Sequence, residues 1–207
     1  MIITLDNISK EFGNNNLFSN LSYTFTEGNK YAILGPEDSG KSTLLQIIAG
    51  KETPTSGKIV YLEKDKEISE DKLSRKISIA SPYIHLIEEF TFSEMVDFHF
   101  KLKKIAGNIN QSKLHGIINL PSIFGKKKIA HYSPAIKQRI KLLLTIFSNV
   151  KVILLDEPTY SLDSEGIKWF QQLIEDYSSG RTIIICSNFK EEETCLCNYK
   201  LNIEDYK

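Results

Sequence analysis

The chain has 207 residues, of which 41% are hydrophobic and 25% charged, as in an ordinary soluble globular protein with enough residues for one large domain. Its 26 basic and 26 acidic side chains balance, which argues against a dedicated nucleic-acid-binding protein. No apolar run approaches the ~18 residues that cross a bilayer, and the N-terminus MIITLDNISK lacks the regions of a secretory signal, so we expect a cytoplasmic protein.

The first third of the chain is predicted to form short strands joined by turns. Alternating or apolar runs predict strands at residues 2–5, 21–25, 31–34 and 57–62, with turns at Gly13 and Gly28. Residues 41–49 have the pattern of a helix, which Gly50 would end. The segment 63–76 is highly charged and is expected to be exposed.

The middle of the chain changes from strand to helix. Residues 77–80 are predicted to form a short strand. Thr91 and Glu94 can form a capping box, and apolar side chains follow at helical spacing. Residues 105–132 show no single secondary-structure pattern, and turn signals occur at Gly107, Asn108, Pro121 and Gly125.

The last third alternates helices with strands. Amphipathic helices are predicted around Ile136–Phe147 and after Asp163, which is expected to cap its helix. The apolar runs Val152–Leu155 and Thr182–Cys186 are typical of strands buried on both faces. This rhythm predicts an α/β fold with a parallel sheet and crossover connections.

Three cysteines, Cys186, Cys195 and Cys197, are consistent with a reducing compartment. The spacing Cys195-Leu196-Cys197 is wrong for paired zinc ligands, and no histidine follows it. We therefore predict that all three are small, mostly buried side chains.

One segment carries a phosphate-binding pattern. Gly35-Pro36-Glu37-Asp38-Ser39-Gly40-Lys41-Ser42 fits G-x-x-x-x-G-K-[ST], with Thr43 next, between a predicted strand and a predicted helix. The glycines let backbone N–H groups form a nest for an anion, and the helix start adds a positive dipole end. Lys41 would reach the β- and γ-phosphates and Ser42 would bind Mg²⁺. This context favours a nucleotide site over a glycine-bearing turn with a solvent lysine.

A Mg²⁺–nucleotide site also needs a carboxylate at the end of a neighbouring strand. Asp156 and Glu157 directly follow the apolar run Val152–Leu155. We expect Asp156 to hold the metal, directly or through water, and Glu157 to orient or deprotonate the attacking water.

The order and spacing of these segments resemble the ATP-binding-cassette (ABC) ATPases, the motor subunits of ABC transporters, over nearly the whole chain. Residues 156–163, DEPTYSLD, resemble the family's Walker B and D-loop. Residues 132–139, YSPAIKQR, stand where the signature LSGGQ-x-QR belongs, and Thr182–Asn188 where the switch histidine's strand and loop belong. Residues 10–13, KEFG, resemble the A-loop.

The resemblance implies a P-loop NTPase (RecA-like) core with a mainly parallel sheet, an N-terminal antiparallel β subdomain and a helical subdomain. The chain would be one nucleotide-binding domain, with the core and antiparallel part at about 1–82 and 133–207 and the helical lobe at about 83–132. The ligands would be ATP and Mg²⁺, and Lys41 and Glu157 would be catalytic.

Family members work as head-to-tail dimers, so the resemblance implies a second cassette, the same chain or another. Each ATP would lie between the phosphate loop of one subunit and the signature of the other. Ser133, in the signature segment, could donate a hydrogen bond to that ATP. Phe12, in the A-loop segment, would stack on adenine unless it is an ordinary core or edge aromatic. The other partner would be a separate transmembrane permease at the inner face of the membrane; no nucleic acid is expected.

Three family positions are changed in this chain. Pro134 and Ala135 replace the signature's glycines and Ile136 its glutamine, and proline has no N–H to offer a phosphate. Pro82 stands where the Q-loop glutamine belongs. Asn188 replaces the switch histidine; it can hydrogen-bond a phosphate but cannot carry a proton.

Near the Q-loop, family members receive a coupling helix of the membrane subunit. Residues that could line the groove for this coupling helix are Tyr83, Ile84, Leu86, Ile87 and Phe90. They could instead pack in the core of the helical lobe itself.

We therefore expect ATP binding, and hydrolysis through the intact Glu157, by the motor subunit of a transporter. One alternative is a nucleotide-gated dimerisation module with little or no hydrolysis, because Pro82, Pro134 and Asn188 replace reactive groups. Another is a soluble ABC protein outside transport, which the single cassette and the neutral charge argue against.

Overall fold

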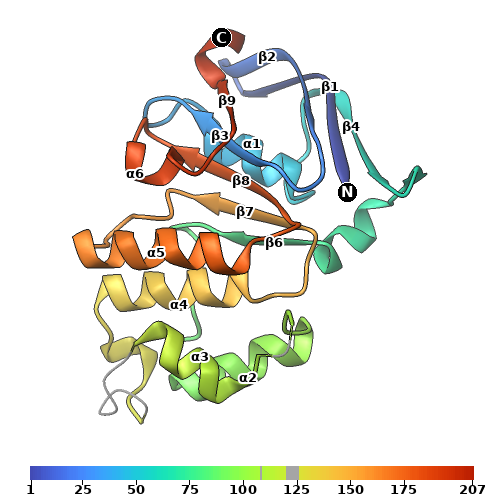
Figure 1. Ribbon diagram of the computed structural model, residues 1–207. Helices are drawn as coiled ribbons and strands as arrows, with labels where there is room; N and C mark the ends of the chain where they lie inside the picture. The colour runs from blue at the N-terminus through green and yellow to red at the C-terminus, as the bar shows by residue number, and fades with distance from the viewer. Residues whose placement is uncertain (108, 120–125) are drawn as a thin grey trace.

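Two sheets of opposite type organise the fold of this computed structural model, which describes residues 1–107, 109–119 and 126–207 (Figure 1). The turn signals at Asn108, Pro121 and Gly125 lie outside the described residues. The termini lie near the antiparallel sheet, while α2 and α3 lie at the opposite end of the molecule (Figure 1).

The antiparallel sheet has the order β2-β1-β4-β5. Its strands are β1 (Ile2–Phe12), β2 (Asn15–Phe25), β4 (Ser56–Glu63) and β5 (Lys66–Glu67). The first two strands are much longer than the predicted 2–5 and 21–25. The pairing of β1 with β2 shifts register at three places between Leu5 and Glu11, and such irregularities break the two-residue alternation from which strands are predicted.

The second sheet is parallel throughout, with the order β6-β7-β8-β3-β9. Its strands are β3 (Lys30–Leu34), β6 (Ile77–Ala80), β7 (Val152–Asp156), β8 (Thr182–Ser187) and β9 (Tyr199–Asn202). Four of them were predicted. The edge strand β9 was not, because exposed Tyr199 and Lys200 leave it without an apolar run.

Helices cover both faces of the parallel sheet. They are α1 (Lys41–Ile48), α2 (Phe92–Leu102), α3 (Gln111–Ile118), α4 (Pro134–Ile146), α5 (Ser164–Tyr177) and α6 (Glu191–Thr194), with 3-10 turns η1 (Glu70–Arg75), η3 (Ile129–His131) and η4 (Ile203–Tyr206). The Thr91–Glu94 capping box of α2 and the Asp163 cap of α5 are confirmed. The charged segment 63–76 is mostly exposed, but η1 buries Leu73.

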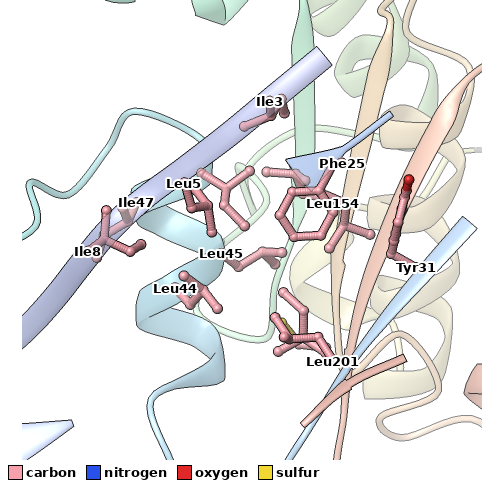
Figure 2. Close-up of a cluster of buried hydrophobic side chains, with 14 of the residues drawn as sticks. Ile3, Leu5, Ile8, Phe25, Tyr31, Leu44, Leu45, Ile47, Leu154 and Leu201 are labelled. Atoms are coloured by element: carbon pink, nitrogen blue, oxygen red, sulfur yellow. The ribbon is translucent and has the colours of Figure 1, made fainter. Parts of the chain in front are cut away.

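Alternate residues of β7 explain why this strand is apolar on both faces. Val152 and Leu154 pack into the cluster that joins α1 to the antiparallel sheet, whereas Ile153 and Leu155 pack into the cluster under α4 and α5. Figure 2 shows Leu44, Leu45 and Ile47 of α1 close to the β1 side chains of the first cluster, with Leu154 on the side of the parallel sheet. The parallel sheet, the antiparallel β part and the covering helices agree with the architecture predicted for a P-loop NTPase core.

The structure also tests the expectations about membrane-spanning helices and about the burial of the three cysteines. No helix among the described residues is long and apolar enough to cross a membrane. Cys186 is buried and Cys197 half-buried, but Cys195 is exposed, so the prediction of three mostly buried cysteines is wrong at that position. Cys195 follows the single turn of α6, which turns Glu193 and Thr194 inward instead.

Candidate functional site

The phosphate loop links the end of β3 to the start of α1. Gly40, which precedes α1, and Asp38 both adopt left-handed backbone conformations, with φ of 96° and 58°. A Cβ on Gly35 would lie 2.6 Å from the Ser39 hydroxyl oxygen and 2.6 Å from a methyl carbon of Ile203, so only glycine fits there. The loop therefore has the tight curvature that points backbone N–H groups toward an anion.

Lys41 is buried beneath this loop. Its Nζ donates to the carbonyl oxygen of Pro36 and lies 3.4 Å from the hydroxyl of Ser39. The loop thus wraps around the ammonium group, which places a positive charge inside the anion nest.

A cavity of about 790 Å³ opens over the loop. Of the predicted site residues it is lined by Glu37, Asp38, Ser39, Gly40, Lys41, Ser42, Thr43, Asp156 and Glu157. It is also lined by residues that were not predicted as ligands, namely Asn15, Leu17, Gln46, Pro82, Tyr83 and Tyr160. Asn15 and Leu17 belong to β2 and carry no local phosphate-binding pattern, so only the tertiary fold identifies them.

Two serines hold the carboxylate of Asp156, which is 2% exposed. The Ser42 hydroxyl donates to Oδ1 at 3.0 Å and the Ser81 hydroxyl donates to Oδ2 at 3.1 Å. Burial raises the pKa of Asp156, and these two hydrogen bonds act in the opposite direction. Ser42 and Asp156 together offer hard oxygen ligands, the kind that Mg²⁺ takes beside phosphates and water.

Ser81 was missed from the sequence. The available signal was its position, because it directly follows the predicted strand 77–80. The carboxyl ends of parallel strands meet at one edge of a sheet, where ligands bind in open α/β folds.

The expected adjacency of the two motif strands is wrong. β8 lies between β3, which leads to the phosphate loop, and β7, which ends at Asp156. The loops after both strands still converge over the carboxyl end of β8. There the carbonyl of Cys186 accepts from the backbone N–H of Glu157 at 3.0 Å, and the Cys186 thiol contacts the carbonyl oxygen of Lys41 at 3.4 Å.

Glu157 stands on a loop with several anchors. Its backbone is left-handed, with φ of 43°, and its side chain lines the cavity. Gln138 donates to the carbonyl of Pro158 at 3.0 Å, and the buried Glu193 accepts from both the N–H and the hydroxyl of Thr159. A strained residue held this firmly is typical of a functional position.

The remaining predicted site residues do not line the cavity. Gly35 and Pro36 belong to the phosphate loop but are not among the residues that line its cavity. Phe12 is 52% exposed at the end of β1, opposite Asn15. Ser133 is exposed and caps α4 by accepting from the N–H of Ile136, and Asn188 is half-buried just after β8.

The changed positions have clear structural settings. Pro134 is the first residue of α4, and Pro82 lines the cavity. Of the candidate groove residues, Leu86, Ile87 and Phe90 pack against the core cluster under α4, whereas Tyr83 is 73% exposed.

The sequence matches the model of one protein family and is similar to known members of that family. The profile of a family described as ABC transporter matches residues 18–160. An uncharacterized ABC transporter ATP-binding protein, YybJ of Bacillus subtilis, is 28% identical over 98% of this chain and 92% of its own length. The lantibiotic transport ATP-binding protein SrtF of Streptococcus pyogenes is 28% identical over 96% of this chain and 85% of its own.

Solved structures share the fold. The ATP-binding cassette MJ0796, in a dimeric post-hydrolysis state bound to ADP and Pi, superposes with a TM-score of 0.80. It is 23% identical in sequence, and the match covers 97% of this chain and 94% of that one.

Proposed function

The chain belongs to the ABC transporter family as an ATP-binding subunit, and on this premise we propose that it binds Mg²⁺–ATP over the phosphate loop and hydrolyses it to drive a separate membrane-spanning partner. The observation that carries the proposal is the meeting of Lys41, Ser42, Asp156 and Glu157 at one cavity. Members of the family are generally ATPases, and the intact Glu157 supports that activity here.

Each residue has a proposed role. Gly35 to Thr43 would cradle the phosphates, with Lys41 neutralising the β- and γ-phosphates. Ser42 and Asp156 would hold Mg²⁺, which supplies charge neutralisation on the phosphate oxygens. Glu157 would orient or deprotonate the attacking water.

The proposed assembly is a head-to-tail pair of cassettes. Ser133 and Pro134 lie outside the cavity of their own chain, so a second cassette, of the same or another chain, would bring its signature to the phosphate loop. Within each chain the core would comprise about 1–82 and 133–207 and the helical lobe about 83–132. The permease would be a separate chain, and the subunit would lie at the inner face of the membrane.

A second candidate function is a nucleotide-gated dimerisation module with little turnover. It is favoured by Pro82, which lines the cavity and has no side-chain group to contact Mg²⁺ or water, and which the resemblance to the family assigns to the Q-loop glutamine position.

Phosphate release from Mg²⁺–ATP, together with calorimetric titration, tests both functions. We expect steady release by the parent protein and a loss of ~10²- to 10⁴-fold in Glu157→Gln, the usual contribution of a general base. Lys41→Ala should lose most of its ATP affinity. Equal release by the parent and Glu157→Gln contradicts the ATPase; ATP-dependent dimerisation by light scattering without phosphate release supports the module. No heat from ATP with folded protein contradicts both.

A further inference from the structure

Lys10 is a buried cation two residues before Phe12 on β1. It is 7% exposed, and its Nζ donates to Oε1 of Glu52 at 2.7 Å and to the carbonyl oxygen of Thr53 at 2.9 Å. Lysines are almost never this buried unless they are paired. The Glu52 carboxylate supplies the pairing, but the lysine's position also brings its charge against an aromatic ring.

That ring is Phe12. The Nζ of Lys10 lies 4.5 Å from the ring centroid, within the range of a cation–π interaction. The ring is nevertheless 52% exposed, so it has open surface for a second planar group. For a half-exposed ring, contact with the ammonium group favours the orientations that keep the charge over the ring face.

Residues 52–55, which include the Lys10 partners Glu52 and Thr53, connect the end of β1 to α1, the helix that follows the phosphate loop. Besides the contacts of Lys10, Thr55 donates its N–H to the carbonyl of Ser9 at 2.8 Å, and its hydroxyl accepts from the N–H of Glu11 at 3.1 Å. Residues 52–55 follow closely on α1, which begins at Lys41. The ring of Phe12 is thus held relative to the element that would bind the phosphates.

Phe12 does not line the cavity itself, but its cross-strand partner does. Phe12 pairs with Asn15 across the β1–β2 turn, and Asn15 lines the cavity above the phosphate loop. A nucleotide whose phosphates occupy the loop could extend its base toward this turn.

We propose that Lys10 is a positioning residue for nucleotide selectivity: anchored by Glu52 and Thr53, it holds the Phe12 ring for stacking on the base. It thereby favours a base-bearing triphosphate over a base-free one. The inference rests on the proposed nucleotide site and deepens it. A purely structural lysine would affect stability alone, and the two roles predict different binding behaviour.

The test compares dissociation constants for Mg²⁺–ATP and Mg²⁺–tripolyphosphate by calorimetry. We expect Lys10→Met to weaken ATP binding by ~3- to 10-fold and tripolyphosphate binding by less than ~2-fold, the size of a cation–π contact acting through the ring. Phe12→Ala should show the same base-selective loss. Adding Lys10→Met to Phe12→Ala should weaken ATP binding no further, because the ring is already gone.

Matched control variants distinguish the effect of the position of Lys10 from a general effect of losing a lysine charge or losing stability. Lys76→Met removes another partly buried lysine, which pairs with Glu63 at 2.8 Å away from Phe12, and should leave the ATP-to-tripolyphosphate ratio unchanged. Lys10→Gln keeps a hydrogen-bond donor without the charge, and it is used if Lys10→Met does not fold; it should show the same base-selective loss. Thermal unfolding verifies that each variant is folded.

The outcomes are distinguishable. A parent that binds neither compound overturns the inference together with the nucleotide site on which it rests. A parent that binds ATP more tightly than tripolyphosphate, with a ratio that Lys10→Met and Lys10→Gln preserve, overturns the role of Lys10 alone. Equal binding of both compounds by the parent likewise overturns the inference but leaves the phosphate site intact.

Discussion

The hydroxyl of Ser42 lies 3.0 Å from Oδ1 of Asp156, although the two residues are 114 positions apart in the chain. This contact joins the first turn of α1 to the end of β7 across the intervening strand β8. Because Ser81 occupies the other carboxylate oxygen, Asp156 is held from both sides before any metal binds. Preorganised ligands of this kind need little rearrangement to accept a cation.

Ser81→Ala is expected to weaken Mg²⁺–ATP binding and lower stability. It leaves Oδ2 of the buried Asp156 without its donor, which costs ~1–2 kcal/mol of unfolding free energy. The matched control is Ser78→Ala on β6, the strand that Ser81 directly follows, since the buried Ser78 hydroxyl donates to the carbonyl of Thr145 at 2.9 Å. Urea denaturation should detect a loss in both variants, whereas calorimetry should find weaker Mg²⁺–ATP binding only in Ser81→Ala. Unchanged binding in both would contradict a role for Ser81 at the site.

Pro134→Ala is expected to raise the rate of ATP hydrolysis. Alanine restores an N–H in the first turn of α4, where no intrahelical acceptor exists, and in the proposed head-to-tail pair this donor would be free for a phosphate bound by the other cassette. One preorganised donor is worth ~10²- to 10³-fold in rate, so a rise of at least ~10-fold should appear in phosphate release. Ala135→Gly, which adds flexibility but no donor, is the control. A rate equal to the parent's in Pro134→Ala would show that the missing donor does not limit turnover.

Glu193→Ala is expected to destabilise the loop that carries Glu157. Oε1 of Glu193 accepts from both the N–H and the hydroxyl of Thr159, and Oε2 has no hydrogen-bond partner within the described part of the chain. Truncation leaves a buried N–H unsatisfied, at a cost of ~1–3 kcal/mol in unfolding free energy measured with urea. Glu193→Gln keeps an acceptor oxygen and should lose clearly less. Equal losses in the two variants would assign the effect to the lost negative charge instead, because glutamine keeps both the volume and an acceptor oxygen.

His99 is expected to make stability depend on pH. Burial, with the nearby Lys103 charge, lowers the pKa of His99 from 6.5 to about 4, against a backbone hydrogen bond at Leu144 that raises it. The unfolded chain therefore takes up the proton first as pH falls, so stability is full above 6.5 and is lost toward about 4. Between about pH 7 and about pH 5 the loss should be ~1 kcal/mol after allowance for partial exposure.

Urea denaturation of the parent and His99→Gln at both pH values checks this prediction. Glutamine can still hydrogen-bond the Ser148 hydroxyl, which lies 2.9 Å from Nε2 of His99, so the two proteins should have similar stability near neutral pH. The parent should then lose more stability on acidification than the variant. Parallel pH profiles would assign the acid sensitivity to other groups.

The predictive power of the sequence was greatest where the signal is local. The phosphate loop, the Asp156–Glu157 pair and the caps at Thr91 and Asp163 are short patterns whose chemistry acts within a few residues. The doubly buried strands β7 and β8 were also predictable, because a strand covered on both faces is apolar at every position. These features suffice to specify the P-loop fold and the nucleotide class of the ligand.

Features that depend on pairing between distant segments could be found only in the tertiary structure. No local periodicity in the sequence indicates three such features. They are the irregular register of β1, the edge strand β9 and the position of β8 between the two motif strands. The same holds for Ser81 on Asp156 and for the ammonium of Lys10 over Phe12. Their partners are brought together by packing, since a single side chain's contacts depend on which strands become neighbours rather than on its own sequence context.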